Sequence, residues 1–307
     1  MSLIVTGSIG IDTIETPDGQ KADSVLGGSS IYFAAGASFF TQVRLVAAVG
    51  EDFPPAFLAA FNHFGVNIHG LETRKGSKTF RWHGRYHENM NDRDTISVDL
   101  NVLAEALPPV PETFKDSQFV FLANTHPAGQ MALLDQFPKR KLVVADTMDL
   151  WIEIAQPELK KLLAQVDGFV LNDSEARLLT GEANAIKAAD AVLALMGDGA
   201  NKFVIVKKGE HGAILRHGAG TVVLPAYPST RVVDPTGAGD TFASGFMGYV
   251  AHKDDTSPET LRQAMAYGTV VASFTIEKFS IGRLQEITRA DIDARLAEYK
   301  KMIATGH

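Results

Sequence analysis

Short apolar runs alternate with helical patterns over much of the chain, and this alternation limits the fold more than any other feature. Six runs have the length and composition of buried strands, at residues 3–6, 44–49, 119–123, 142–146, 168–171 and 203–206. Helical patterns follow them at residues 30–40, 56–64, 131–137, 157–166, 174–180 and 185–196. Continuous apolar strands separated by helices are typical of a parallel sheet with helices on both faces. We therefore expect an α/β fold with a central, mostly parallel sheet.

One stretch, from Phe80 to His87, breaks this alternation. Its even positions are aromatic or glycine and its odd positions are cationic or histidine, a period of two that predicts a two-faced strand. Ile96 and Val98 repeat the pattern after a polar loop, so we expect an antiparallel hairpin outside the main sheet, joined by strands from residues 11–25. The hairpin is either a simple edge decoration or a lid that closes over a ligand. The predicted organisation is one domain over residues 1–307, with a lid subdomain at approximately 11–25 and 78–100.

Charge and composition narrow the classes of partner. The chain of 307 residues has a formal net charge of −7 and no basic block, which argues against a nucleic-acid or anionic-membrane partner. It has no cysteine, so disulfides, thiolate catalysis and cysteine-bound metals are excluded. Neither a signal peptide nor an apolar run of membrane-spanning length is visible. We therefore expect a cytoplasmic protein.

The run from Val233 to Phe242 carries the strongest chemical signal. The sequence Gly237-Ala238-Gly239 permits a sharp turn in which several backbone N–H groups converge, and a helix predicted to begin at about Asp240 adds its positive dipole end. Together these features predict an anion site. An aspartate beside an anion suits a general base that takes a proton from a hydroxyl attacking a phosphate. The alternative is that Asp240 only caps the helix.

Two motifs near the N-terminus suggest a site for a small molecule. Gly27 and Gly28 precede a predicted helix and would allow close approach of the backbone to a ligand, although they are also compatible with a simple capping turn at Ser29 or Ser30. Asp12 follows the first strand, where its carboxylate could accept hydrogen bonds from sugar hydroxyls. An exposed turn aspartate is the alternative interpretation.

Two further motifs lie at predicted strand ends. Asn172 and Glu175 have the spacing of a helix capping box, but their oxygens could also organise the water shell of Mg²⁺ and the phosphates of a nucleotide. Lys207 begins a segment containing Gly209 and Gly212 that could be only a hairpin turn. The lysine would nonetheless be placed to meet a nucleotide phosphate.

The order of these motifs resembles that of the ribokinase-like carbohydrate kinases, the PfkB family. The resemblance rests on Gly27-Gly28, Asn172-x-x-Glu175, Lys207-x-Gly209-x-x-Gly212 and Asp234-x-Thr236-Gly237-Ala238-Gly239-Asp240, and it covers essentially the whole chain. The family implies a central β-sheet flanked by helices, a small β-lid, and ATP- and Mg²⁺-dependent phosphorylation of a primary hydroxyl.

The resemblance also implies a role for each matching residue. The implied roles are catalytic base for Asp240, anion hole for Gly237, Ala238 and Gly239, nucleotide binding for Asn172, Glu175, Lys207, Gly209 and Gly212, and acceptor binding for Asp12, Gly27 and Gly28. Glu175 would contact Mg²⁺ through water. Many members bind a monovalent cation near the residues that match Asp234 and Thr236, so K⁺ is a candidate additional cofactor.

Two departures from the family pattern lie at the acceptor end. Gly10 stands where ribokinases often carry asparagine, and the second departure is the sequence Ser29-Ser30-Ile31-Tyr32 after the glycine pair, where lysine or asparagine followed by small residues is common. These changes leave the ATP chemistry intact and the identity of the acceptor open.

The sequence therefore predicts an ATP-dependent kinase of a small sugar or sugar derivative. A nucleoside kinase of the adenosine type is the first alternative, since Phe80, Trp82 and Tyr86 could stack on a nucleobase. A catalytically idle member that binds a sugar or nucleotide is the second. The expected partner is a small-molecule acceptor, and the expected assembly is a monomer or a homodimer formed through the lid.

Overall fold

The main sheet of the molecule has nine strands among the residues described by the computed structural model, which are 2–199 and 201–304. Its order is β13-β12-β11-β10-β9-β8-β1-β4-β5, and all neighbours are parallel except β11 with β12 and β12 with β13. The strands are β1 (Leu3–Thr6), β4 (Val43–Gly50), β5 (Asn67–Arg74), β8 (Phe119–Leu122), β9 (Leu142–Asp146), β10 (Gly168–Asn172), β11 (Phe203–Lys207), β12 (Ala213–His217) and β13 (Gly220–Leu224).

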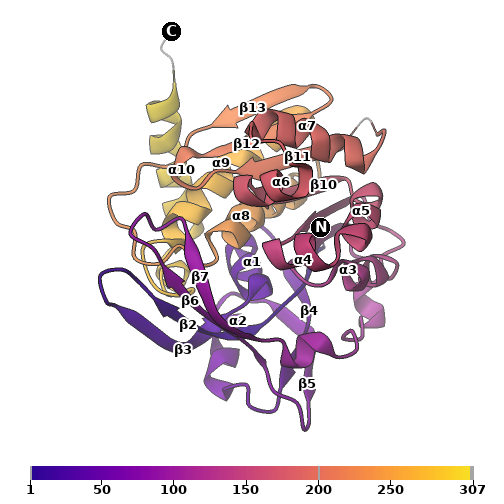
Figure 1. Cartoon of the computed structure of the whole chain (residues 1–307), viewed down its shortest axis with the longest axis vertical. Coiled ribbons are helices and arrows are strands. Elements are labelled where there is room, and N and C mark those ends of the chain that lie inside the picture. Colours follow the sequence, from indigo (N-terminus) through magenta and orange to yellow (C-terminus); the bar gives the residue numbers. More distant parts are fainter. Residues whose placement is uncertain (1, 200, 305–307) are drawn as a thin grey trace.

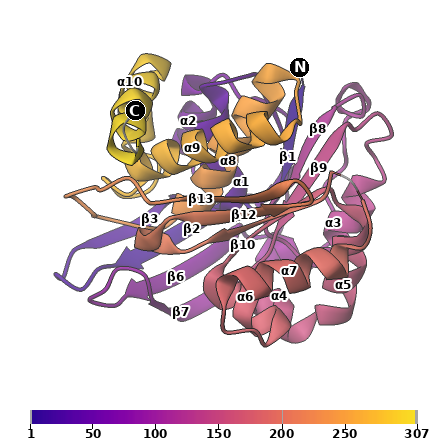
Figure 2. The ribbon, with the colours of Figure 1, turned by 90° about the horizontal axis from the view of Figure 1, so that it is seen from above.

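Helices cover both faces of this sheet, so the molecule has three layers (Figures 1 and 2). One face carries α1 (Ser29–Ser38), α2 (Leu58–His63), α8 (Ala238–Lys253), α9 (Pro258–Thr275) and α10 (Arg289–Ile303). The other carries α3 (Pro127–Leu134), α4 (Asp149–Ile154), α5 (Gln156–Gln165), α6 (Asp173–Thr180) and α7 (Ala185–Met196). The sequence prediction of a mostly parallel sheet flanked by helices is therefore confirmed.

Alternation of side chains along the buried strands creates two separate hydrophobic cores. In β1, Leu3 and Val5 pack in the core beneath α1, α8 and α9, whereas Ile4 packs in the core beneath α3, α5 and α7. The rings of Phe33 and Phe121 stack in the first core with centroids 4.2 Å apart. Because both faces of these strands are buried, their sequences are continuously apolar, as the sequence pattern indicates.

A second sheet stands beside the main one and forms the lid (Figure 1). Its order is β3-β2-β6-β7, and the strands are β2 (Gly10–Glu15), β3 (Lys21–Gly27), β6 (Phe80–Tyr86) and β7 (Arg93–Asp99). β6 and β7 pair antiparallel as predicted, and β2 pairs with β6 in parallel. The end of β6 and the loop after it connect the lid to the body, because the Tyr86 hydroxyl is 3.0 Å from Thr236 Oγ1 and Asn91 lies against Gly209.

Two helix starts and one strand differ from the sequence-based expectation. Helix α8 begins at Ala238 rather than at about Asp240, since Gly237 occupies the N-cap position in a left-handed conformation. Helix α3 begins at Pro127 rather than 131, with His126 as its cap. Strand β5 has no predicted counterpart. It lies at the edge of the sheet and is partly exposed, so its sequence mixes polar and apolar residues and lacks the continuous apolar run of a buried strand. Within the described parts of the chain, no helix has the length and apolar character needed to span a bilayer.

Candidate active site

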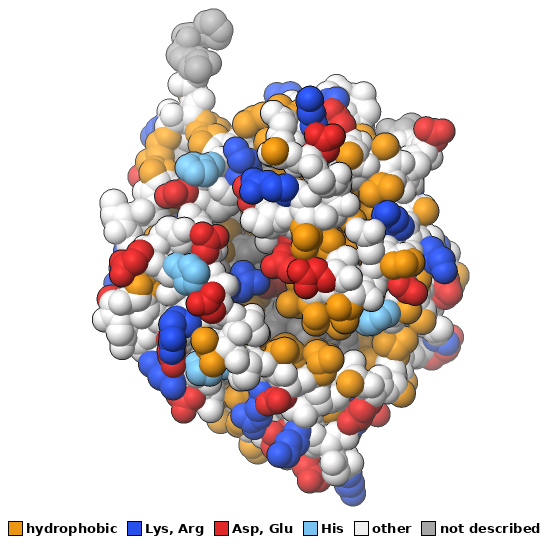
Figure 3. Space-filling model, in the orientation of Figure 1, with side chains coloured by type: hydrophobic (Ala, Val, Ile, Leu, Met, Phe, Trp, Pro, Cys, Tyr) orange, Lys and Arg blue, Asp and Glu red, His pale blue; other side chains and the backbone are white. Residues whose placement is uncertain are grey.

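The candidate site lies at the carboxyl edge of the main sheet, where three neighbouring parallel strands end in polar residues. β9 ends at Asp146, β10 at Asn172 and β11 at Lys207. Asn172 and Lys207 are direct register partners, and Asp146 is the partner of Val170. Ligands of open α/β sheets bind in the crevice outside this edge. Figure 3 shows a hollow in this view of the molecule, with Lys or Arg and Asp or Glu side chains gathered in and around it.

The predicted anion loop lies at the start of α8. Gly237 has φ 77°, and a Cβ atom there would lie 2.2 Å from the ring of Tyr32, so only glycine fits. A Cβ at Gly239 would lie 2.5 Å from Nζ of Lys207, which places the ammonium group against the first turn of the helix. A helix N-terminus beside a lysine attracts an anion twice, through the helix dipole and through the charge.

Asp240 is the third residue of α8 and does not cap the helix. Gly237 occupies the N-cap, and no side chain makes a capping hydrogen bond there. Burial raises the pKa of Asp240 to about 6, although attraction to Lys207 and to Arg93 of the lid lowers it. The carboxylate is therefore ionised at neutral pH and remains basic enough to accept a proton from a bound hydroxyl.

Asn172 and Glu175 form the capping box of α6. Asn172 Oδ1 accepts from the Glu175 N–H and Glu175 Oε2 accepts from the Asn172 N–H, both at 2.7 Å. Burial raises the pKa of Glu175 to about 7, and attraction to Lys207 lowers it. The second carboxylate oxygen and the amide nitrogen of this pair stay outside the capping hydrogen bonds. The structural and the nucleotide-binding interpretations of these two residues are therefore compatible.

The described residues contain no cluster of three or more His, Asp or Glu side chains that could hold a metal by itself. Glu175 and Asp146 are the buried carboxylates at the strand ends, and hard oxygen ligands suit Mg²⁺. These residues would suit a magnesium ion for which water molecules and phosphate oxygens supply most of the ligands. Contact of Glu175 with Mg²⁺ through water stays a prediction.

Asp12 and the glycine pair come together within electrostatic reach of Asp234 and Asp240. A Cβ atom at Gly27 would lie 1.9 Å from Asp12 Oδ2, so the carboxylate rests directly on the glycine backbone. Gly28, at φ 94°, occupies the N-cap position of α1, and its backbone N–H donates a hydrogen bond to the Asp12 carboxylate. Asp12 is 3 % exposed, and its Oδ1 finds no hydrogen-bond partner among the described residues. Asp12 is thus a buried acceptor and no exposed turn residue.

Asp234 has its carboxylate occupied by the protein. Its oxygens accept from the Thr236 N–H at 2.9 Å and from the Ser280 N–H at 3.2 Å, and burial raises its pKa to about 6. The Ser280 hydroxyl in turn donates to the carbonyl of Leu26 at the end of β3. Asp234 therefore ties the anion loop to the segment around residue 280 and to the lid. A K⁺ site at Asp234 and Thr236 stays a prediction.

Gly209 and Gly212 shape the loop between β11 and β12. A Cβ at Gly212 would lie 2.0 Å from the carbonyl oxygen of Leu224, and the residue has φ 88°, so the strand pairing itself demands glycine. Gly209, at φ 52°, lies under Asn91 of the lid loop. The backbone conformation of this loop therefore favours glycine at both positions. Gly209 is also the point where the lid contacts the loop that begins at Lys207.

Three residues at the site escaped the sequence analysis as site residues. Asp146 follows an apolar run in the same way as Asn172, and this parallel is a signal that could have found it. Burial and repulsion from Asp240 raise the pKa of Asp146 well above its ordinary value. Arg93 begins β7 and acts electrostatically on Asp240 and Glu175. Tyr32 packs against the anion loop, and only the three-dimensional fold brings it there.

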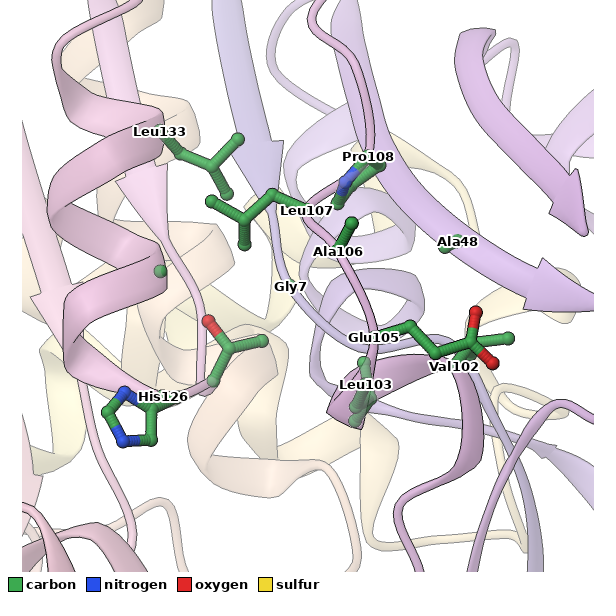
Figure 4. Close-up of a pocket in the computed structure, with 12 residues that line it drawn as sticks. Gly7, Ala48, Val102, Leu103, Glu105, Ala106, Leu107, Pro108, His126 and Leu133 are labelled. Carbon is green, nitrogen blue, oxygen red and sulfur yellow. The ribbon is translucent and has the colours of Figure 1, made fainter. Parts of the chain in front are cut away.

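A small cavity of about 50 Å³ lies between β1, β4, α3 and residues 102–108 (Figure 4). Gly7 lies in its wall, and a Cβ atom there would lie 2.7 Å from Ser30 Oγ and 3.0 Å from Ser29 Oγ. Leu107 and Leu133 also line it, and most of its wall is apolar.

The buried Asp12 should make stability depend on pH. Its pKa rises from 3.8 to about 7 in the folded protein because burial disfavours the ionised form. Protonated Asp12 therefore costs the folded protein nothing at a pH below its unfolded pKa. As the pH rises through the folded pKa, Asp12 ionises in its buried place and the free energy of unfolding falls. We expect Asp12→Asn to match the wild type in free energy of unfolding at about pH 4 and to exceed it at about pH 7.5. Urea unfolding at both pH values measures this, and a difference that does not change with pH would contradict it.

Comparisons with known proteins identify the family and relatives of the chain. The model of the pfkB family carbohydrate kinases matches residues 2–287. A cytidine kinase of Thermococcus kodakarensis is 32 % identical over 253 residues, which cover 80 % of this chain and 87 % of that protein.

Solved structures share the fold at lower identity. The nucleoside kinase of Burkholderia thailandensis in complex with inosine superimposes with a TM-score of 0.75 and 20 % identity, covering 98 % of this chain and 97 % of that one. The ribokinase of Cryptococcus neoformans var. grubii in complex with ADP gives a TM-score of 0.77 and 20 % identity, covering 95 % and 99 %. The chain belongs to the pfkB family of carbohydrate kinases.

Proposed function

We propose that this protein is an ATP-dependent kinase that phosphorylates a hydroxyl group of a ribonucleoside. The observation that carries the phosphoryl-transfer part is the position of Asp240 in the first turn of α8, beside the anion loop and Lys207. The nucleoside part is supported by the similarity to a cytidine kinase over 80 % of the chain. The sugar acceptor predicted from the sequence remains the second candidate, supported by the fold shared with a ribokinase.

In the proposed reaction, Asp240 holds the acceptor hydroxyl and takes its proton as the oxygen attacks the γ-phosphorus. The bond from this phosphorus to the β–γ bridging oxygen breaks at the same time, and ADP leaves. The N–H groups of Gly237, Ala238 and Gly239 stabilise the negative charge that grows on the transferring phosphoryl group. Lys207 adds a fixed positive charge at the same place. Mg²⁺, held through water at Glu175, would neutralise the phosphate oxygens of the donor.

The lid completes the proposed site by excluding water. It contacts the body at Thr236, next to the anion loop, and at Gly209, in the loop that begins at Lys207. Arg93 contributes a second cation from the lid side, close enough to act on Asp240. Enclosure of the donor phosphates between these elements would favour transfer to the acceptor over hydrolysis.

A coupled ADP-release screen with Mg²⁺ and ATP tests the proposal. The panel contains the common purine and pyrimidine ribonucleosides, ribose, fructose, 2-keto-3-deoxy sugar acids and inositol, with and without K⁺. We expect one ribonucleoside to support ADP release at least about 10-fold above every sugar, as a ratio of kcat/KM. A sugar that exceeds all nucleosides would overturn the nucleoside assignment and retain the kinase. Binding of ATP and an acceptor without any phosphorylated product would indicate the idle member.

A further inference from the structure

Tyr32 occupies one of the positions where the sequence departs from the family pattern. It lies in the first turn of α1, after Gly28, and its side chain is 1 % exposed. Its ring lies against the backbone of Gly237, where a Cβ atom would be 2.2 Å from Cδ1. The side chain therefore reaches from the first turn of α1 to the anion loop.

The hydroxyl group of Tyr32 is buried, and it has no hydrogen-bond partner among the residues that the structure describes. Nearby polar groups are already engaged. The Asp234 carboxylate accepts from two backbone N–H groups, and the Tyr86 hydroxyl pairs with Thr236. Two other buried atoms in this region, Asp12 Oδ1 and Ser30 Oγ, likewise have no partner among the described residues. Of these two, Asp12 carries the charge that acts on Tyr32, so an unpaired donor and an unpaired acceptor lie within electrostatic reach of each other.

Leaving such groups unpaired is costly. A buried polar group without a hydrogen bond costs on the order of 1–3 kcal/mol, and phenylalanine would fill the same volume without that cost. Burial and the carboxylates of Asp234 and Asp12 raise the pKa of Tyr32 well above its ordinary value, so the phenol stays neutral. A neutral phenol and an aspartate together offer one donor and one acceptor, which complements the hydroxyl groups of a polyol.

We propose that Tyr32 is an acceptor-binding residue, whose hydroxyl donates a hydrogen bond to a ribose hydroxyl while Asp12 Oδ1 accepts one from the same diol. The inference rests on the proposed ribonucleoside acceptor. It assigns to Tyr32 the discrimination between a ribonucleoside and its deoxy analogue, because a buried group left unpaired by the analogue penalises binding.

The test combines removal of the phenol hydroxyl with removal of the ribose hydroxyl. The variants are Tyr32→Phe and the control Tyr299→Phe, whose hydroxyl donates to the Pro225 carbonyl at 2.6 Å outside the site. Each is assayed with the preferred ribonucleoside and with its 2′-deoxy and 3′-deoxy analogues. We expect Tyr32→Phe to raise the acceptor KM about 10-fold for the ribonucleoside and to leave it unchanged for one analogue. The KM for ATP should not change.

Stability separates this role from a structural one. The unligated Tyr32→Phe protein should be as stable as the wild type or more stable, whereas Tyr299→Phe should lower the melting temperature without a change in acceptor KM. Equal losses of Tyr32→Phe on all three acceptors, or no loss on any, would overturn the inference. If a sugar proves to be the acceptor, the proposed nucleoside function fails, and the same cycle with that sugar and its deoxy analogues decides the role of Tyr32.

Discussion

Asp240→Asn is expected to lower kcat by at least about 10²-fold while leaving the binding of ATP and acceptor within a few-fold. The amide has the size and shape of the carboxylate but cannot take the proton of the attacking hydroxyl. The remaining rate would come from the anion loop and Lys207, which the substitution does not touch. Single-turnover measurements with the preferred acceptor, together with calorimetric titration of both ligands, distinguish a chemical defect from a binding defect.

The same substitution should make the unligated protein more stable at neutral pH. Burial raises the pKa of Asp240 to about 6, which means that the folded protein carries an ionised group in an unfavourable place. Its replacement by a neutral amide should raise the free energy of unfolding by on the order of 1 kcal/mol at about pH 7.5. Greater stability combined with lost turnover is the signature of a functional carboxylate rather than a structural one.

A matched control uses Asp167, which lies outside the site. Its Oδ2 accepts from the Val143 N–H at 2.8 Å, and burial raises its pKa as well. Asp167→Asn should leave kcat unchanged. A turnover number for Asp240→Asn close to that of the wild type would show that another group is the base, and Asp12 would then be the first to examine.

Gly27→Ala is expected to lower kcat/KM for the acceptor by about 10²-fold or more, with little effect on ATP binding. The added Cβ would lie 1.9 Å from Oδ2 and 2.2 Å from Cγ of Asp12, so the carboxylate must move out of its place. Ser29 cannot substitute for it, because Ser29 is bound to Ser8 through both its backbone and its hydroxyl. The loss should be seen mainly in the acceptor KM.

The control for this variant is Gly19→Ala in the turn between β2 and β3. Gly19 has φ 81° and nothing within 4 Å of a new Cβ, so its substitution strains the backbone without crowding a side chain. We expect lower stability with unchanged kinetics for Gly19→Ala. An unchanged acceptor KM in Gly27→Ala would mean that Asp12 does not contact the acceptor.

The sequence predicts the sheet better than its borders. Strands buried on both faces, such as β1 and β8, are recognisable because every side chain must be apolar. β5 lies at the edge of the sheet and is partly exposed, and therefore its sequence resembles a loop. The lid hairpin was found because its period of two survives even though β7 is exposed throughout.

The site is predictable wherever local geometry demands a residue type. Gly237 needs its positive φ, and the capping box of Asn172 and Glu175 follows from helix chemistry, so both leave a signal in the sequence. Tyr32 and Arg93 leave none, because each reaches the site through contacts between segments far apart in the chain. Tyr32 could be noted only as an unusual residue after the glycine pair.

The link from the Ser280 hydroxyl to the Leu26 carbonyl joins residues 254 positions apart, beneath the lid and next to Asp234. Closing so long a loop is entropically costly, and the segment around Ser280 is synthesised long after β3. We therefore expect the region around Asp12 and the glycine pair to form only after this later segment has been made. An incomplete chain holds most of the residues for phosphoryl transfer but has no assembled place for the acceptor.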